Sequence, residues 1–315
     1  ESHADVGDKA NDSLRVNADE LRCVAVGEGG NLGLTQLARV EYGLGGGLSF
    51  TDFVDNSAGV DCSDHEVNIK ILLHEVAQSA KSKRGARSAK AERERSELLE
   101  SMTEEVSDLV LANNYSQVQT LALTFADTEF GCKEFNDLIE FLEAEAGLDR
   151  GIEYLPTLEV LERRKASGGS PTRAELAVAT SYMKMYLKAE LVNAAYLADS
   201  SLAAHLARAF PATLVQRFGD HVERHPLRAE LMATQLANYV INRIGAFSLL
   251  ELLRSSSAGT SEVVRAVLLS IEAFGAERYW ASIEALDYEV DSSLQNRMML
   301  RVIRRIREGA RWFLR

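Results

Sequence analysis

Residues 21–27 read LRCVAVG and run directly into the glycine-rich segment EGGNLG at 28–33. The first segment alternates and carries valines, which is typical of a short buried strand. A short helix is predicted over 34–42, a turn over 43–47 (GLGGG) and a second strand over 48–54 (LSFTDFV). This order predicts a piece of a parallel α/β sheet. Two strands do not make a stable sheet alone, so the piece is too short to be a whole domain.

The rest of the chain has a helical period. After the segment DNSAGV (55–60), a helix is predicted over 63–79, and from about residue 86 apolar side chains recur at i, i+3 and i+4. Thr172-x-x-Glu175 predicts a capping box, and Thr260 is expected to cap a later helix. Further helices are predicted over 172–191, 202–210, 212–222, 227–253, 276–288 and 294–314. The predicted fold class is mainly α, with a short α/β N-terminal segment followed by an all-α helical domain.

The composition is that of an ordinary globular protein. The 315 residues are 46% apolar and 26% charged, and no apolar run reaches the length of a membrane-spanning helix. The formal net charge is −12, which disfavours general nucleic-acid binding. Cys23, Cys62 and Cys132 are widely spaced and lack a zinc-ligand pattern. We therefore expect no membrane, nucleic-acid or metal site, and a reducing, cytoplasmic compartment.

Several short motifs resemble nucleotide-binding, metal-binding or acid-base sites, but the sequence favours a structural interpretation of each. GEGGNLG fails the dinucleotide pattern G-x-G-x-x-G because Leu32 stands at the third glycine, and a tight strand-to-helix turn at Gly29 and Gly30 is the favoured interpretation. His221 and His225 have metal-ligand spacing, but no third ligand is evident and a solvated surface pair is favoured. The groups DHE (64–66) and HE (74–75) are expected to be helix-start carboxylates or an exposed helical face.

Two basic segments could contact acidic surface. Residues 81–95 read KSKRGARSAKAERER, and arginines at 297–311 flank an apolar stripe that includes Met299, Ile303, Ile306 and Phe313. A solvated helix and a core helix with a charged face are the default interpretations. The alternative is contact with residues 1–80, where the acidic excess lies, or with another subunit.

Long stretches of the chain resemble the large, NAD-specific class of bacterial glutamate dehydrogenases. They are VAVGEGGNLGLTQ (24–36), TDFVDNSAGVDCSDHEVNIKILL (51–73), YLPTLEVLERRKASGGSPTRAELAVATSYMK (154–184) and QNRMMLRVIRRIREGARWFL (295–314). The resemblance implies that 1–85 are the last part of a Rossmann-like NAD-binding domain and that 86–315 are a helical C-terminal domain. It also implies a homo-oligomer.

Two loops resemble motifs of smaller glutamate dehydrogenases. Residues 28–31 (EGGN) are similar to their E-G-A-N element, and 56–60 (NSAGV) to their N-A-G-G-V element, with Gly30, Ser57 and Ala58 as departures. The implied NAD-binding residues are Glu28, Gly29, Gly30, Asn31 and Asn56, and the implied substrate-binding residue is Ser63. Because both loops follow predicted parallel strands, Asn31 and Asn56 are expected within one ligand length of each other.

The family's catalytic Lys and Asp, and its pyrophosphate-binding glycines, match no segment of this chain. The resemblance therefore implies a C-terminal part of a larger NAD-dependent glutamate dehydrogenase, which converts L-glutamate to 2-oxoglutarate and ammonia. The rest of that polypeptide is the implied partner. No catalytic residue is expected here, and the chain alone is expected to be inactive. The alternative is a non-catalytic helical interaction or regulatory module that retains an enzyme-derived N-terminal segment.

Overall fold

Helices form nearly all the regular structure of the computed structural model. The structure describes residues 13–30, 33–84 and 89–315, and it describes side chains for all of these except residues 80–84 and 89–91. The helical elements are η1 (Ala18–Glu20), α1 (Gln36–Leu44), α2 (Asp52–Asp55), α3 (Ser57–Arg84), α4 (Ala89–Ser101), α5 (Thr103–Ala126), α6 (Cys132–Glu145), α7 (Leu158–Ala166), α8 (Arg173–Leu191), η2 (Ala195–Ala198), η3 (Ser200–Leu202), α9 (Ala203–Ala207), α10 (Ala212–Glu223), α11 (Arg228–Ser255), α12 (Thr260–Phe274), α13 (Ala276–Glu284) and α14 (Ser292–Phe313). The prediction of a mainly helical chain is confirmed.

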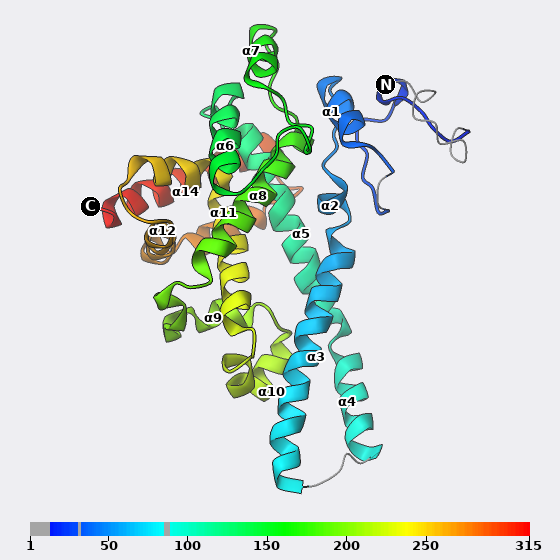
Figure 1. Ribbon diagram of the computed structural model, residues 1–315, viewed down its shortest axis with the longest axis vertical. Helices are drawn as coiled ribbons and strands as arrows, with labels where there is room; N and C mark the ends of the chain where they lie inside the picture. The colour runs from blue at the N-terminus through cyan, green and yellow to red at the C-terminus, as the bar shows by residue number, and fades with distance from the viewer. Residues whose placement is uncertain (1–12, 31–32, 85–88) are drawn as a thin grey trace.

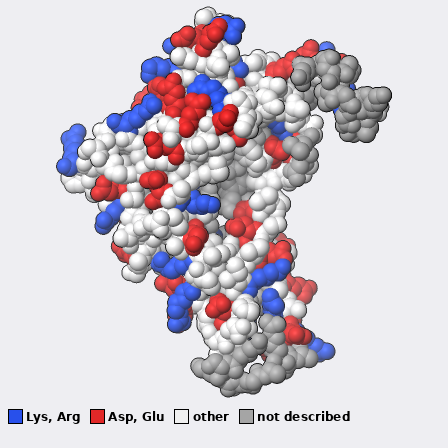
Figure 2. All heavy atoms as spheres, viewed as in Figure 1, with Lys and Arg blue, Asp and Glu red and all other residues white. Residues whose placement is uncertain are grey.

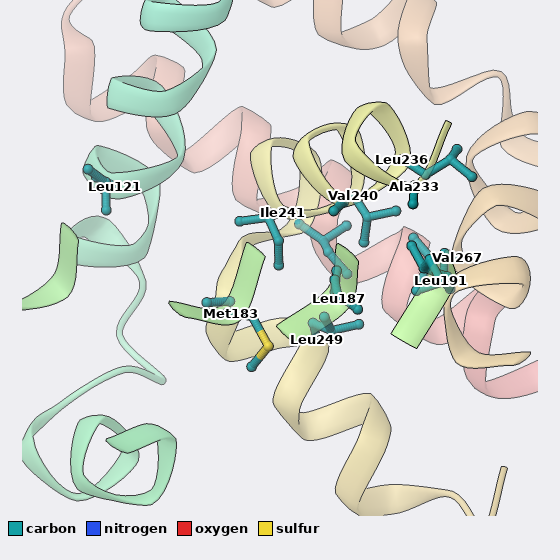
Figure 3. Close-up of a cluster of buried hydrophobic side chains, with 14 of the residues drawn as sticks. Leu121, Met183, Leu187, Leu191, Ala233, Leu236, Val240, Ile241, Leu249 and Val267 are labelled. Atoms are coloured by element: carbon teal, nitrogen blue, oxygen red, sulfur yellow. The ribbon is translucent and has the colours of Figure 1, made fainter. Parts of the chain in front are cut away.

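The centre of the fold is α11, which packs against α8, α5, α14 and α12 (Figure 1). Leu187 of α8 and Leu236 and Leu249 of α11 are completely buried where these helices meet (Figure 3). Because α11 has neighbours on several sides, most of its residues are buried and it shows no single apolar stripe. Gly245 lies between its two halves with φ 80°, a conformation that favours glycine.

The capping box predicted at the start of α8 is confirmed. Thr172 Oγ1 accepts a hydrogen bond from the Glu175 backbone N–H at 3.3 Å, and the Glu175 carboxylate accepts one from the Thr172 N–H at 2.7 Å. Arg164, in the last turn of α7, adds an ion pair to the same carboxylate at 2.8 Å. These bonds satisfy N–H groups that the helix leaves unpaired, and the ion pair ties the last turn of α7 to the first turn of α8.

The N-terminal segment packs directly on this helical body. In Figure 1, α1, α2 and α3 follow one another along one side of the molecule. Helix α1 lies against α8, and α3 lies against α5 and α10. The predicted helix over 63–79 forms, but α3 begins six residues earlier, at Ser57.

The two predicted strands, 21–27 and 48–54, do not form as predicted. Within the described residues they form only one parallel bridge, between Ala25 and Leu48, and no sheet. The Val26 N–H donates to the Leu48 carbonyl at 2.9 Å, and the Leu48 N–H donates to the Val24 carbonyl at 2.9 Å. The end of the second predicted strand is instead helix α2, where Asp52 stands in the first turn and suits a helix start.

Smaller corrections concern helix ends. The cap of α12 is Gly259 rather than Thr260, and the Thr260 hydroxyl bonds to Tyr186 instead, at 2.6 Å. The predicted helix over 202–210 is a 3-10 turn followed by the five residues of α9. Helix α13 ends at Glu284, so Tyr288 is fully exposed rather than helical.

The arginine-rich last helix keeps its apolar side in the core, with Ile303 and Ile306 buried, although Phe313 is exposed. Arg304 pairs with Asp127 at 3.2 Å, and Arg307 pairs with Glu129 at 3.0 Å. These arginines therefore contact acidic groups of the loop after α5, and Arg307 also pairs with Glu251 of α11, rather than with any described residue of 1–80. On the face in Figure 2, Lys and Arg are interspersed with Asp and Glu.

The basic segment 81–95 lies partly outside the described residues. Its described side chains, such as Arg93 and Arg95 on α4, are exposed. No helix in the described part of the chain is long and apolar enough to cross a membrane.

Candidate functional site

A buried arginine joins the two loops that the sequence singles out. Arg39 of α1 is 1% exposed and forms ion pairs with Glu28 and, at 3.4 Å, with Asp55. Its guanidinium also donates to the Phe50 carbonyl at 2.6 Å, and the Glu28 N–H donates to Asp55 Oδ2 at 3.3 Å. Glu28 and Asp55, the residue before Asn56, are thereby held together.

Burial sets the electrostatics of this network. It raises the pKa of the Asp55 carboxyl above its ordinary value, while the hydrogen bond from the Glu28 N–H and the charge of Arg39 oppose that rise. The Glu28 carboxylate is already occupied, because it pairs with Arg39 and accepts from the Gly33 N–H at 2.5 Å. Glu28 is thus placed to shape its loop.

The glycines of the first loop border open space. A Cβ atom built at Gly29 would meet nothing within 4 Å, and one at Gly30 would meet only the Glu28 carboxylate, at 3.8 Å. A ligand can therefore approach this backbone closely, as a dinucleotide requires. Asn31 lies outside the described residues, so its predicted proximity to Asn56 stays a prediction.

Asn56 marks the break between two helices. It ends α2 with φ −105° and ψ 30°, and α3 begins at the next residue. Asn114 of α5 spans this break: its Nδ2 donates to the Val54 carbonyl at 2.9 Å and to Ser57 Oγ at 2.7 Å. The next amide on α5, Asn113, donates to Asp61 Oδ2 at 2.8 Å.

A cleft of about 400 Å³ opens beside Asn56, where α2 and α3 meet α5, α8 and α11. Most of the residues that line it have polar side chains, and Phe53, Val54, Val60, Leu121 and Ala177 add apolar surface. The polar residues include Asn56, Ser57, Asp61, Asn113, Gln117, Thr180, Lys184, Asn238 and Asn242. The cleft therefore lies between the N-terminal segment and the helical body, next to the predicted site residue Asn56.

Lys184 brings a cation into this cleft. Its Nζ donates to Gln117 Oε1 at 3.0 Å. Burial lowers the pKa of Lys184 to about 8, because it disfavours the charged ammonium, and the nearby Asp61 carboxylate opposes that shift. A cation among amides can bind an anionic or carbonyl oxygen.

No motif pointed to Lys184, although its spacing offered a signal. Ala177, Thr180, Ser181 and Lys184 all line the cleft and follow one another at i, i+3, i+4 and i+7 on α8. A small and polar stripe on a helix that is otherwise buried indicates a face that borders a cavity.

Ser63 lies on an exposed part of α3, and its Oγ donates to the Gly59 carbonyl at 3.1 Å. It is not among the residues that line the cleft, which come from the face of α3 bearing Ser57, Asp61 and Asp64. Its role as a substrate-binding residue stays a prediction.

The histidine predictions need correction. His221 and His225 do not share a helix face, because α10 ends at Glu223. His225 is buried rather than solvated: its Nε2 lies 3.2 Å from the Asn68 carbonyl, and burial lowers its pKa. His65 is also buried, with Nδ1 3.0 Å from the Ala209 carbonyl. Among the described residues, no group of three or more His, Cys, Asp or Glu side chains could hold a metal.

Comparison with known proteins covers almost the whole chain. Residues 1–124 match a family model described as bacterial NAD-glutamate dehydrogenase, catalytic domain. Residues 170–315 match one described as glutamate dehydrogenase, C-terminal. The NAD-specific glutamate dehydrogenase of Pseudomonas aeruginosa is 45% identical over 315 residues, that of Halomonas elongata is 42% identical over 315, and that of Mycobacterium tuberculosis is 38% identical over 314. These matches cover 100% of this chain but only 19% of each relative's length.

Proposed function

We propose, because the chain belongs to the family of bacterial NAD-glutamate dehydrogenases, that it forms part of an enzyme converting L-glutamate to 2-oxoglutarate and ammonia with reduction of NAD. Residues 1–85 contribute the closing part of a Rossmann-like NAD-binding domain. Residues 86–315 form a helical domain that supports this part and carries no step of the reaction.

The observation that carries this proposal is the parallel bridge between Ala25 and Leu48. Parallel pairing places the chain ends that follow both segments on the same side, which is where α/β sheets bind nucleotides. The network of Glu28, Arg39 and Asp55 then holds the two following loops together.

The same segment has surface that further strands of a cofactor domain would cover. Val24, Leu48, Phe53 and Val60 are 76%, 43%, 45% and 75% exposed. The relatives are about five times as long as this chain, so a complete sheet has ample sequence from which to form. Rossmann-like strands supplied by the remaining polypeptide would bury these side chains and extend the single bridge.

Each site residue then has a distinct task. The open backbone at Gly29 and Gly30 allows close approach of the cofactor, and Glu28 holds that loop in shape through Arg39 and the Gly33 N–H. The Asn56 amide provides two donors and an acceptor, which suit ribose hydroxyls or a carboxamide. Asn31 and Ser63 complete the set, as a second amide and as a partner for the substrate's side-chain carboxylate. NAD supplies the hydride chemistry when bound.

The groups that transfer protons and bind the pyrophosphate are assigned to the remainder of the polypeptide. We further propose a cytoplasmic homo-oligomer, as the family resemblance implies. The partners of this chain are then the remaining polypeptide, glutamate and NAD.

Asn56→Ala in the longer polypeptide tests the site. We expect the KM for NAD to rise roughly tenfold, as loss of one or two hydrogen bonds predicts. Asn193→Ala is the matched control, because Asn193 is an exposed amide in the turn after α8. NADH absorbance gives the rates. Equal KM values for the two variants would remove Asn56 from the cofactor site.

A further inference from the structure

The α2–α3 break is held from outside its own segment. Asn114 lies on α5, 57 residues beyond Ser57 in sequence, and it donates to the Val54 carbonyl at 2.9 Å and to Ser57 Oγ at 2.7 Å. Val54 is 1% exposed, so the backbone before the break is fixed in the core. Asn56 lies between these two acceptors. One side chain of the helical body therefore grips both sides of the predicted cofactor residue.

The second acceptor exists because of a departure in the motif. Where the resembled element N-A-G-G-V has alanine, this chain has Ser57, and the Ser57 hydroxyl accepts one of the two bonds. An alanine there would leave Asn114 with the Val54 carbonyl alone.

We propose that Asn114 is a positioning residue for NAD binding, which sets the orientation of Asn56 by hydrogen bonds to Val54 and Ser57. This inference rests on the proposed function. It assigns the helical body a specific task, because α5 then fixes the loop that receives the cofactor. Asn114 touches neither the cofactor nor the substrate in this account.

The variants are chosen to separate positioning from folding. Asn114→Ala removes both donated bonds, and Asn114→Asp keeps the shape but has no N–H to donate. Ser57→Ala removes one acceptor and leaves the other. Ser116→Ala is the control on the same helix, because the Ser116 hydroxyl bonds only to the Ala112 carbonyl of α5 itself, at 2.8 Å.

Two kinds of measurement are made on the longer polypeptide. Calorimetry gives the Kd for NAD without glutamate, and steady-state rates separate the KM for NAD from kcat. We expect Asn114→Ala and Asn114→Asp to raise Kd and KM roughly tenfold, and Ser57→Ala roughly threefold, because one bond remains. The kcat should change less than about threefold, since the reacting groups lie elsewhere. Ser116→Ala should match the wild type.

A double-mutant cycle provides the sharper test. If Asn114 acts through Ser57, the Asn114→Ala/Ser57→Ala variant binds NAD no more weakly than Asn114→Ala alone. Hydrogen exchange should also rise in the peptide 52–60 of the Asn114 variants, while the peptides of α11 stay protected.

Three outcomes would overturn the inference. In the first, Asn114→Asp lowers the melting temperature but leaves the Kd for NAD unchanged, so the role is structural only. In the second, the effects of the two substitutions multiply, so the residues act independently. In the third, the wild-type polypeptide neither binds NAD nor oxidises glutamate, which overturns the proposed function as well. The first two outcomes, seen with an active wild-type polypeptide, overturn the inference alone.

Discussion

Replacing Glu175 by alanine should destabilise the chain more than any other change to a helix cap. The carboxylate is 1% exposed and accepts from the Thr172 N–H at 2.7 Å, from the Thr172 hydroxyl at 2.9 Å and from Arg164 at 2.8 Å. Glu175→Ala leaves Arg164, which is 14% exposed, without its partner. Breaking a buried ion pair and a capping box together costs about 4 kcal/mol of unfolding free energy.

The chain contains a matched control for this prediction. Glu262 occupies the same capping position in α12, where its carboxylate accepts from the Gly259 N–H at 2.9 Å, but its side chain is exposed. Glu262→Ala should cost only about 0.5–1 kcal/mol, because water satisfies the freed N–H. Glu175→Gln should fall between these values, at about 2 kcal/mol, since the amide oxygen still accepts from Thr172 but the charge is lost.

Urea denaturation, followed by circular dichroism and extrapolated linearly to water, gives the three unfolding free energies. The slopes should stay equal, so that the midpoints report stability directly. If Glu175→Ala and Glu262→Ala cost the same within about 0.5 kcal/mol, burial does not decide the strength of a capping box.

Three further predictions use the same assay. Gly245→Ala should lower the unfolding free energy by about 1–3 kcal/mol, because an L residue is strained at φ 80°. Gly219→Ala is the control and should be neutral or stabilising, because nothing lies within 4 Å of its Cβ position. Equal effects of the two substitutions would exclude backbone strain at Gly245. Burial and a neighbouring arginine lower the pKa of His205 to about 4, so stability should fall as pH drops from about 6.5 towards 4, and His205→Gln should weaken that dependence; an unchanged pH profile would contradict this. Arg307→Met should lower the unfolding free energy by about 3 kcal/mol, because Glu129 and Glu251 lose a buried partner. A loss under about 1 kcal/mol would show that water screens these ion pairs as it screens surface pairs.

Local patterns predicted the helical part of the fold well. Phe135, Leu138 and Leu142 recur at the helical period of i, i+3 and i+7, and all three are completely buried on α6. The Thr172 cap was predictable because both partners lie within four residues of each other. Helix ends were less predictable, since Gly259 rather than Thr260 caps α12 and tertiary contact engages the threonine hydroxyl.

The prediction of two strands was wrong for a physical reason. Alternation in LRCVAVG indicates a strand, but a strand needs partners, and the described residues provide one parallel bridge at Ala25. The prediction of a solvated histidine pair was wrong for a similar reason. The spacing of His221 and His225 does not show that His225 lies beyond the end of α10 and is buried against α3, next to the Asn68 carbonyl. Burial of this kind depends on contacts between residues far apart in sequence.

The candidate site was predictable in part. The motifs pointed to Glu28 and Asn56, and the structure joins their loops through Arg39, which no motif contained. Lys184 and Asn114 were not found because each reaches the site from another helix, and only the packed fold brings them near Asn56.

The most direct test of the central claim is NADH formation from L-glutamate and NAD, followed by absorbance, with the chain alone and with the longer polypeptide that contains it. We expect steady NADH formation by the longer polypeptide and none by the chain alone above a heat-treated control, because a catalytic unit that lacks members loses its rate. Glutamate-dependent NADH formation by the chain alone would contradict the assignment of catalysis to the remaining polypeptide. Absence of activity in both would contradict the proposed function itself.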